Sequence, residues 1–221
     1  MNDLNLLVII VNRTDEKKIL KLINKYNVGF KFITYGEGTA SSSLLEYFDL
    51  NDEEKAIIML VLPPLMSMKI LNVLKSKINV CEHGKGISFS IPLSSSTKYM
   101  LDFYKSDEME DVGMNEVCQH LIVTIVNQGY AEKVMNEAKK GGATGGTTIS
   151  GRGLSDVKAV KFLNIAIEPE KDIVLILVPV DKKNDIMNLI VDNCGIKTPG
   201  AGICFSLPVD NVVGLNKELI D

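Results

Sequence analysis

Apolar residues of this chain gather in short runs of strand length, with polar and charged residues between the runs. Residues 7–13, LVIIVNR, and 122–128, IVTIVNQ, are two such runs, and Ile57–Leu62 and Ile173–Val178 are apolar throughout. A short, uniformly apolar run bounded by turn signals is typical of a strand buried on both faces. We therefore expect Ile57–Leu62 and Ile173–Val178 to be central, buried strands.

Two segments between these runs predict helices. Glu132–Lys140 and Asp181–Asn193 place apolar residues at helical spacing. The first segment runs into Gly141-Gly142, a common signal for the end of a helix. These glycines belong to the stretch Lys139–Gly153, KKGGATGGTTISGRG, which fits neither a P-loop nor a dinucleotide fingerprint, because Thr147 and Asp156 stand where those motifs need a lysine and a third glycine.

The whole pattern occurs twice along the chain. Residues 7–13 match 122–128 at an offset of 115 (122 minus 7), and Gly36-Glu37-Gly38 falls on Gly151-Arg152-Gly153 at the same offset. Gly84-Lys85-Gly86 falls on Gly200-Ala201-Gly202 one residue later. A repeat of this kind indicates a tandem duplication. We expect an α+β fold of two ferredoxin-like βαββαβ units, residues 1–98 and 118–221, joined by a linker over residues 99–117.

Each copy has a Gly-x-Gly sequence, called a glycine triplet below, after its second strand, and another before its last strand. In the second copy these are Gly151-Arg152-Gly153 and Gly200-Ala201-Gly202. Their order resembles the PII signal-transduction family, the nitrogen regulatory proteins. The resemblance implies a trimer of chains that binds adenine nucleotides in clefts between subunits, and a loop between strands two and three that reports the bound nucleotide to a partner.

The resemblance also implies which residues bind the ligand. They are Gly151, Arg152, Gly153, Gly200, Ala201 and Gly202 in the second copy, and Gly36, Gly38, Gly84, Lys85 and Gly86 in the first. In the family, the glycines let backbone N–H groups close on the nucleotide.

The chain departs from the family pattern at several positions. Ile203 stands where the family usually has a lysine, Gly214 and Asn216 stand where it has basic residues, and the loop has no tyrosine. Glu37 replaces Arg152 in the first copy and would repel phosphate. We expect ATP, ADP or AMP to prefer the second copy, with Arg152 pairing with phosphate and a dissociation constant of about 1 μM.

Composition narrows the class of function. The net charge of −4 and the absence of a Lys/Arg cluster argue against a nucleic-acid partner. Four cysteines without a CxxC pair indicate reduced thiols in a cytoplasmic protein. With only two histidines in the chain, we expect no dedicated metal site. Because no Ser/His/Asp, Cys/His or paired-carboxylate set converges on a motif, we expect no enzymatic activity.

The leading hypothesis is therefore a PII-like regulator of the cytoplasm. Its loop Leu154–Lys158 would contact a transporter, at the membrane surface, or a metabolic enzyme. Association into a trimer is expected also because a ferredoxin-like sheet leaves one face uncovered. The alternative hypothesis is a structural or metal-tolerance protein on the same trimeric scaffold that binds no nucleotide.

Overall fold

The computed structural model describes residues 4–39, 53–77, 86–104, 118–153, 160–162, 165–167 and 170–214. The strands are β1 (Asn5–Asn12), β2 (Phe30–Gly38), β3 (Glu53–Leu62), β4 (Gly86–Pro92), β5 (Gln119–Asn127), β6 (Thr147–Arg152), β7 (Val160–Phe162), β8 (Ile165–Ile167), β9 (Glu170–Pro179) and β10 (Ile203–Val213). The helices are the 3-10 helix η1 (Arg13–Asp15) and the α-helices α1 (Glu16–Ile23), α3 (Pro64–Lys77), α4 (Lys98–Tyr104), α5 (Ala131–Lys140) and α6 (Lys183–Cys194).

The strands form one closed barrel in the order β1-β3-β2-β6-β9-β5-β10-β4, and β7 and β8 pair separately. The expectation of two tandem ferredoxin-like units is therefore wrong. It failed because β2 and β10 each form a ladder with a strand of the other copy. The end of β2 pairs with β6 at Glu37 and Gly38, and the end of β10 pairs with β4 at Asp210 and Val213.

The repeat is still visible in the strand order, because β4-β1-β3-β2 of the first copy returns as β10-β5-β9-β6 of the second. The physical reason for expecting chains to associate was that each of two separate sheets has an uncovered face. A closed barrel removes that reason, so a trimer now rests on the family resemblance alone.

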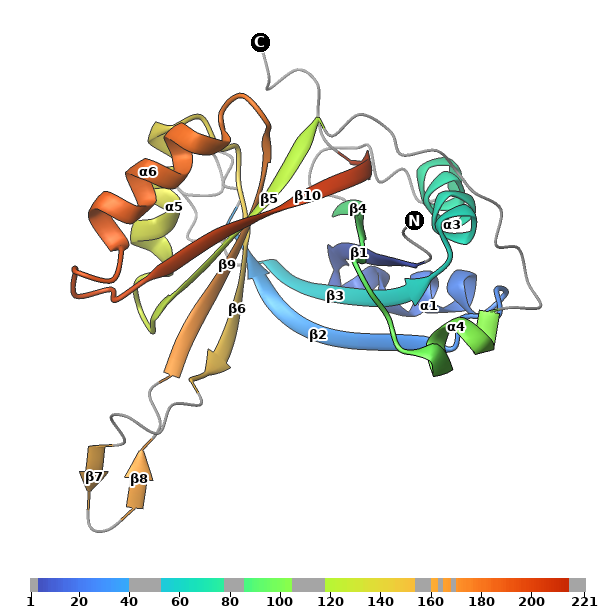
Figure 1. Ribbon diagram of the computed structural model, residues 1–221, viewed down its shortest axis with the longest axis horizontal. Coiled ribbons are helices and arrows are strands. Elements are labelled where there is room, and N and C mark those ends of the chain that lie inside the picture. The colour runs from blue at the N-terminus through green and yellow to red at the C-terminus, as the bar shows by residue number, and fades with distance from the viewer. Residues whose placement is uncertain are drawn as a thin grey trace. The chain divides into compact units, whose positions relative to one another are not determined.

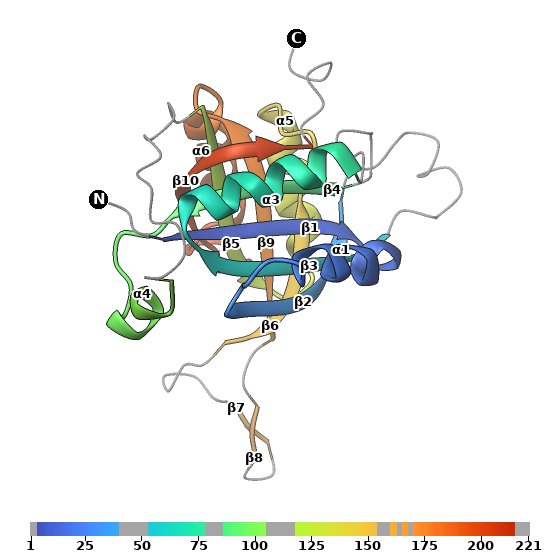
Figure 2. The ribbon, with the colours of Figure 1, turned by 90° about the vertical axis from the view of Figure 1, so that its right-hand side faces the viewer.

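The chain divides into two compact units. Unit 1 comprises Met1–Tyr35, Glu54–Gln119 and Pro208–Asp221, and unit 2 comprises Gly36–Glu53 and His120–Leu207. Figure 2 shows α1 and α3 over the strands of unit 1, and Figure 1 shows α5 and α6 side by side over the strands of unit 2. Among the described residues, no helix combines the length and the apolarity needed to cross a membrane.

The core of unit 1 lies between its sheet and its helices. Alternate residues of β1, Leu7, Ile9 and Val11, are completely buried there, as strand geometry requires of one face. They pack with residues of α1, α3 and β3, among them Ile19, Ile23, Ile58, Leu60, Ile70 and Leu74. The expectation for Ile57–Leu62 is confirmed except at Met59, which is half-buried.

The core of unit 2 repeats this arrangement. Val174, Ile176 and Val178 of β9 are completely buried with residues of α5 and α6. The alternate residues Ile173 and Leu175 are only half-buried. The expectation that Ile173–Val178 is buried on both faces therefore holds for one face. The predicted helices are confirmed as α5, which ends at Lys140 directly before Gly141, and α6.

Part of the expected linker is an ordered helix. Residues 98–104 form α4, whose Tyr104 is 1% exposed and belongs to the core of unit 1. The Tyr104 hydroxyl donates to the carbonyl oxygen of Val61 at 2.7 Å and accepts from the backbone N–H of Gly29 at 3.2 Å. Residues 105–117 lie outside the described residues.

Candidate ligand site at the ends of β6 and β9

The triplet Gly200-Ala201-Gly202 is explained by packing within unit 2. A Cβ atom on Gly202 would lie 2.4 Å from the carbonyl oxygen of Cys194, and one on Gly200 would lie 3.1 Å from the ring of Tyr130. Ala201 has a φ of 46°, in the left-handed region. Glycine at position 202 is thus needed for the chain to pass close to the end of α6, whether or not a ligand binds. A side chain at position 200 would require the Tyr130 ring to shift slightly.

Two of the three N–H groups of this triplet are already engaged. Ala201 donates to the carbonyl oxygen of Thr198, and Gly202 donates to that of Cys194, both at 2.9 Å. These two groups are therefore not available to a nucleotide in this conformation. Gly200 also contributes its carbonyl oxygen, which accepts from the backbone N–H of Asn127 at 2.9 Å.

Gly151 differs from these glycines because the fold does not require it. A Cβ atom there would meet the Ile173 side chain at 3.4 Å, an ordinary van der Waals contact, and its φ is outside the left-handed region. In the ladder between β6 and β9, Gly151 lies directly opposite Lys171. Directly opposite residues project to the same face of a sheet. The missing side chain at Gly151 therefore leaves space beside the Lys171 side chain.

Lys171 and Asn127 form the centre of the candidate site. The Lys171 Nζ atom donates to the Asn127 Oδ1 atom at 2.6 Å. The amide nitrogen of the same asparagine donates to the carbonyl oxygen of Pro199 at 2.9 Å. Asn127 thus connects the lysine opposite Gly151 to the loop that carries Gly200. The lysine opposite Gly151 and the loop that carries Gly200 therefore bond to the same asparagine, although they are far apart in sequence.

The first copy contains the same pair. The Lys55 Nζ atom lies 2.5 Å from the Asn12 Oδ1 atom, and the two residues are opposite each other in the ladder between β1 and β3. Asn12 and Asn127 are related by the offset of 115 (127 minus 12), and Lys55 and Lys171 by 116 (171 minus 55). Sequence reasoning missed this pair. The sequence feature that indicates this pair is the asparagine that the two matched segments LVIIVNR and IVTIVNQ share.

The predicted phosphate ligand Arg152 lies at the end of β6 with an exposed side chain, directly opposite Glu170 in the ladder. A cation and a carboxylate at opposite positions are within reach of each other. An anionic ligand at Arg152 would therefore compete with Glu170. Lys171 faces no such carboxylate directly across the ladder, since its opposite residue is Gly151.

The first copy also has an arginine that directly follows its asparagine in sequence. The Arg13 guanidinium carbon lies 4.0 Å from the centre of the Tyr35 ring, and its NH1 atom lies 3.6 Å from the Glu54 carboxylate. The corresponding residue of the second copy is Gln128. Although Glu37 replaces Arg152, unit 1 thus keeps a lysine and an arginine near the end of β1.

The remaining residues predicted to bind the ligand include one glycine that the fold requires, glycines at strand ends, and residues outside the described part of the chain. Gly86 has a φ of +138°, and a Cβ atom there would lie 2.4 Å from the carbonyl oxygen of Ile10, so the fold requires glycine. Gly36 and Gly38 lie in the last part of β2, and Gly153 follows β6. Gly84, Lys85 and the proposed contact loop Leu154–Lys158 lie outside the described residues.

Neither cysteine near this site is an activated nucleophile. Burial raises the pKa of the Cys194 and Cys204 thiols, so both stay protonated at neutral pH. In the part of the chain that the structure describes, no three His, Cys, Asp or Glu side chains gather in a way that could hold a metal ion. The group that this site offers to a ligand is the Lys171 ammonium, which suits an anion.

Comparison with known proteins gives only distant likenesses. No family model matches the chain, and no curated protein matches it. The solved structure of Arabidopsis thaliana PII bound to citrate is 22% identical and covers 43% of this chain and 78% of its own, with a TM-score of 0.33. The B. subtilis GlnK–ATP complex is 20% identical over 42% of this chain and 84% of its own, with a TM-score of 0.32.

A microcompartment protein from Desulfitobacterium hafniense DCB spans much more of the chain. It covers 95% of this chain and 96% of its own, at 9% identity and a TM-score of 0.29. All of these TM-scores are low. Neither a function nor a ligand is transferred from these proteins to this chain.

Proposed function

We propose that this chain is a regulatory protein that senses a small anionic molecule, an adenine nucleotide, in unit 2 and controls a transporter or a metabolic enzyme. The ligand would lie beside the Lys171 ammonium, in the space left by Gly151. Arg152, the last residue of β6, starts from the opposite face of the strand, and its long side chain would reach the phosphates around the strand end. The proposal assigns no catalytic step to the chain. Adenine nucleotides are the first ligands to test because the resemblance of the two glycine triplets implies them.

One observation carries the proposal: Lys171 is held by Asn127 opposite a glycine that packing does not require. An ammonium fixed by one hydrogen bond has two further N–H donors to offer. Glycine allows a ligand to approach the backbone closely, and it costs chain entropy on folding, so a glycine without a structural reason favours a binding role. The same lysine–asparagine pair in unit 1 supports a role common to both copies.

The position of the site suggests how binding could be reported. Gly151 and Arg152 end β6, while Glu170 and Lys171 begin β9. A ligand that binds there would contact both ends of the segment between these strands. If it binds one arrangement of that segment better than the others, it shifts the population toward that arrangement. A partner that contacts Leu154–Lys158 would then distinguish the liganded protein from the free one.

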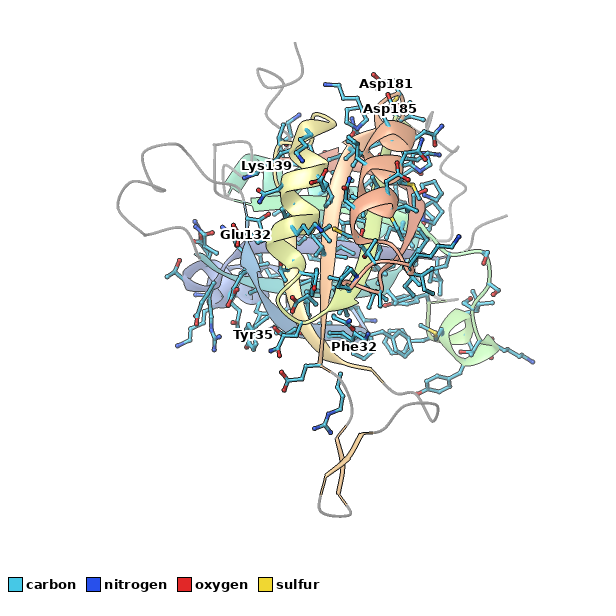
Figure 3. All side chains as sticks on the ribbon, turned by 90° about the vertical axis from the view of Figure 1, so that its left-hand side faces the viewer. Phe32, Tyr35, Glu132, Lys139, Asp181 and Asp185 are labelled. Carbon is cyan, nitrogen blue, oxygen red and sulfur yellow. The ribbon has the colours of Figure 1, made fainter. Side chains whose placement is uncertain are left out.

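Isothermal titration calorimetry tests the ligand directly. Wild-type protein should bind at least one of ATP, ADP and AMP with a dissociation constant of about 1 μM, a free energy of about −8 kcal/mol. Arg152→Glu should weaken binding about tenfold or more, because it replaces a cation by a carboxylate. Lys139→Glu makes the same charge change at an exposed position of α5 (Figure 3) and should leave affinity unchanged.

These measurements separate failure of the nucleotide proposal from failure of the assignment of Arg152. If wild type gives no heat and no equilibrium-dialysis signal with any of the three nucleotides, the nucleotide proposal is wrong. If wild type binds and Arg152→Glu binds equally well, Arg152 is not a phosphate ligand, and the Lys171 variant then decides whether the ligand lies beside Lys171. The trimer implied by the resemblance is tested separately, by light scattering on the wild-type protein.

A further inference from the structure

Within the described residues of unit 1, the segment Phe30–Tyr35 of β2 is an open sheet edge. In the barrel order β2 lies between β3 and β6, but its ladder to β6 consists of Glu37 and Gly38, which lie beyond Phe30–Tyr35. Figures 1 and 2 both show β2 as the outermost strand of the unit 1 sheet. Among the described residues of unit 1, no strand pairs with the outer side of Phe30–Tyr35.

This edge exposes large apolar side chains. Phe32 is 57% exposed, Ile33 36% and Tyr35 43%. Figure 3 shows Phe32 and Tyr35 projecting from β2. Natural proteins usually protect an open edge with prolines, bulges or several charges, because an apolar edge pairs with other strands. Between Phe30 and Tyr35 the only charged residue is Lys31, and there is no proline.

The apolar surface continues from β2 onto α4. The Phe30 ring lies edge-on to Tyr99 and Phe103, with centroid distances of 6.3 and 5.6 Å. Tyr99 is 74% exposed and Phe103 38%. Neighbouring exposed apolar side chains of this kind are a feature of protein interaction sites.

We propose that this edge pairs with the same edge of a second copy of the chain, antiparallel, about a two-fold axis perpendicular to the sheet. Such an axis pairs even-numbered residues with even-numbered ones and odd-numbered residues with odd-numbered ones. Two registers then use most of Phe30–Tyr35: in one Phe32 faces Phe32 of the second copy, and in the other Ile33 faces Ile33. Lys31 then faces Ile33 or Tyr35 of the second copy and never another lysine. Like charges directly opposite each other would destabilise a pair of strands, and neither register contains them.

A second copy fits this edge better than continued growth of a sheet does. In a two-fold contact both chains use the same patch, so each open edge is closed by the other and assembly stops at a pair. The aromatic side chains of α4 would add apolar area to the short backbone ladder. The contact does not depend on ligand binding in unit 2, and it is compatible with a dimer or with a pair of trimers.

Light scattering with size-exclusion chromatography tests the pairing. The wild-type protein should contain two or six chains. Ile33→Lys should raise the dissociation constant about tenfold or more, because lysine 33 would face itself or Lys31 in the two registers. Ile196→Lys makes the same change at a residue that is 71% exposed in unit 2, and it should leave the mass unchanged. Circular dichroism verifies that both variants are folded.

Charge complementation separates loss of pairing from loss of folding. If Ile33→Glu alone has one or three chains, but a mixture of Ile33→Glu and Ile33→Lys has two or six, the register is centred on Ile33. If Ile33→Glu pairs alone, the register is centred on Phe32, where glutamate would face Lys31. A wild-type protein of one or three chains at micromolar concentration, or an Ile33→Lys variant that associates like wild type, overturns the proposal.

Discussion

The Nζ atom of Lys171 lies 2.6 Å from the Oδ1 atom of Asn127, and the first copy of the repeat places Lys55 and Asn12 in the same relationship. Residues around these pairs have diverged: Arg13 corresponds to Gln128, and Glu37 to Arg152. A pair that both copies retain while its neighbours change has either a common structural role or a common ligand. The two roles predict different results when single residues are changed.

Two glycines separate packing from ligand binding. Gly202→Ala should destabilise the protein by about 1–3 kcal/mol, because its Cβ atom would lie 2.4 Å from the carbonyl oxygen of Cys194. Gly151→Ala should change the free energy of unfolding by less than about 1 kcal/mol, since its Cβ atom makes an ordinary contact with Ile173. Urea unfolding measures both.

Gly151→Ala should affect ligand binding although it leaves the free energy of unfolding almost unchanged. Gly151→Ala places a methyl group beside Lys171 and should weaken adenine-nucleotide binding in calorimetry. A Gly151→Ala variant that loses several kcal/mol of stability would show that this glycine has a structural role instead.

Tyr104 should anchor α4 to the sheet of unit 1. Tyr104→Phe removes the hydroxyl that bonds Val61 and Gly29 and should lower the free energy of unfolding by about 1–2 kcal/mol. Tyr99→Phe, at a side chain that is 74% exposed on the same helix, should change it by less than about 0.5 kcal/mol. Equal effects of the two variants in urea unfolding would contradict the anchoring role.

Asp210 should make stability depend on pH. Burial raises the pKa of its carboxyl group, whose Oδ1 atom is buried without a hydrogen-bond partner among the described residues. The folded protein therefore binds this proton more tightly than the unfolded chain, whose aspartate pKa is about 3.9. The free energy of unfolding should fall as pH rises from about 4 through the raised pKa, and stay lower above it.

Asp210→Asn isolates this contribution because it has the same shape and does not titrate. The unfolding free energy of the variant minus that of wild type should increase from about pH 4 upward and then level off. Denaturant unfolding at a series of pH values measures the difference. A difference that is constant with pH, or one that grows toward acid, would show that burial does not control this carboxyl group.

Local features of the fold could be predicted from the sequence because they depend on neighbouring residues. The apolar runs identified the strands, and Gly141-Gly142 marked the end of α5, since both signals are local. The closure of the barrel could not be predicted in this way. It depends on a few long-range backbone pairs, such as Glu37 with Thr148 and Asp210 with Ser90, which leave no pattern of apolar and polar residues.

The candidate site was predictable only in part. The glycine triplets were found, but their sequence alone does not distinguish Gly202, which packing requires, from Gly151, which it does not. Lys171 was missed because a single lysine at the start of an apolar strand resembles a solvated end residue. Its role became visible only when β5 and β9 placed it beside Asn127.

Calorimetry of the lysine variants with ATP, ADP and AMP tests the central claim most directly. Lys171→Met should weaken nucleotide binding about tenfold or more, because it removes the ammonium and retains much of the apolar stem. Lys55→Met should have a smaller effect, since Glu37 disfavours phosphate in the first copy, and Lys139→Met on α5 should have none. Urea unfolding verifies that each variant is folded. A folded Lys171→Met protein that binds nucleotide as tightly as wild type would contradict the proposal that unit 2 senses an anion at this lysine.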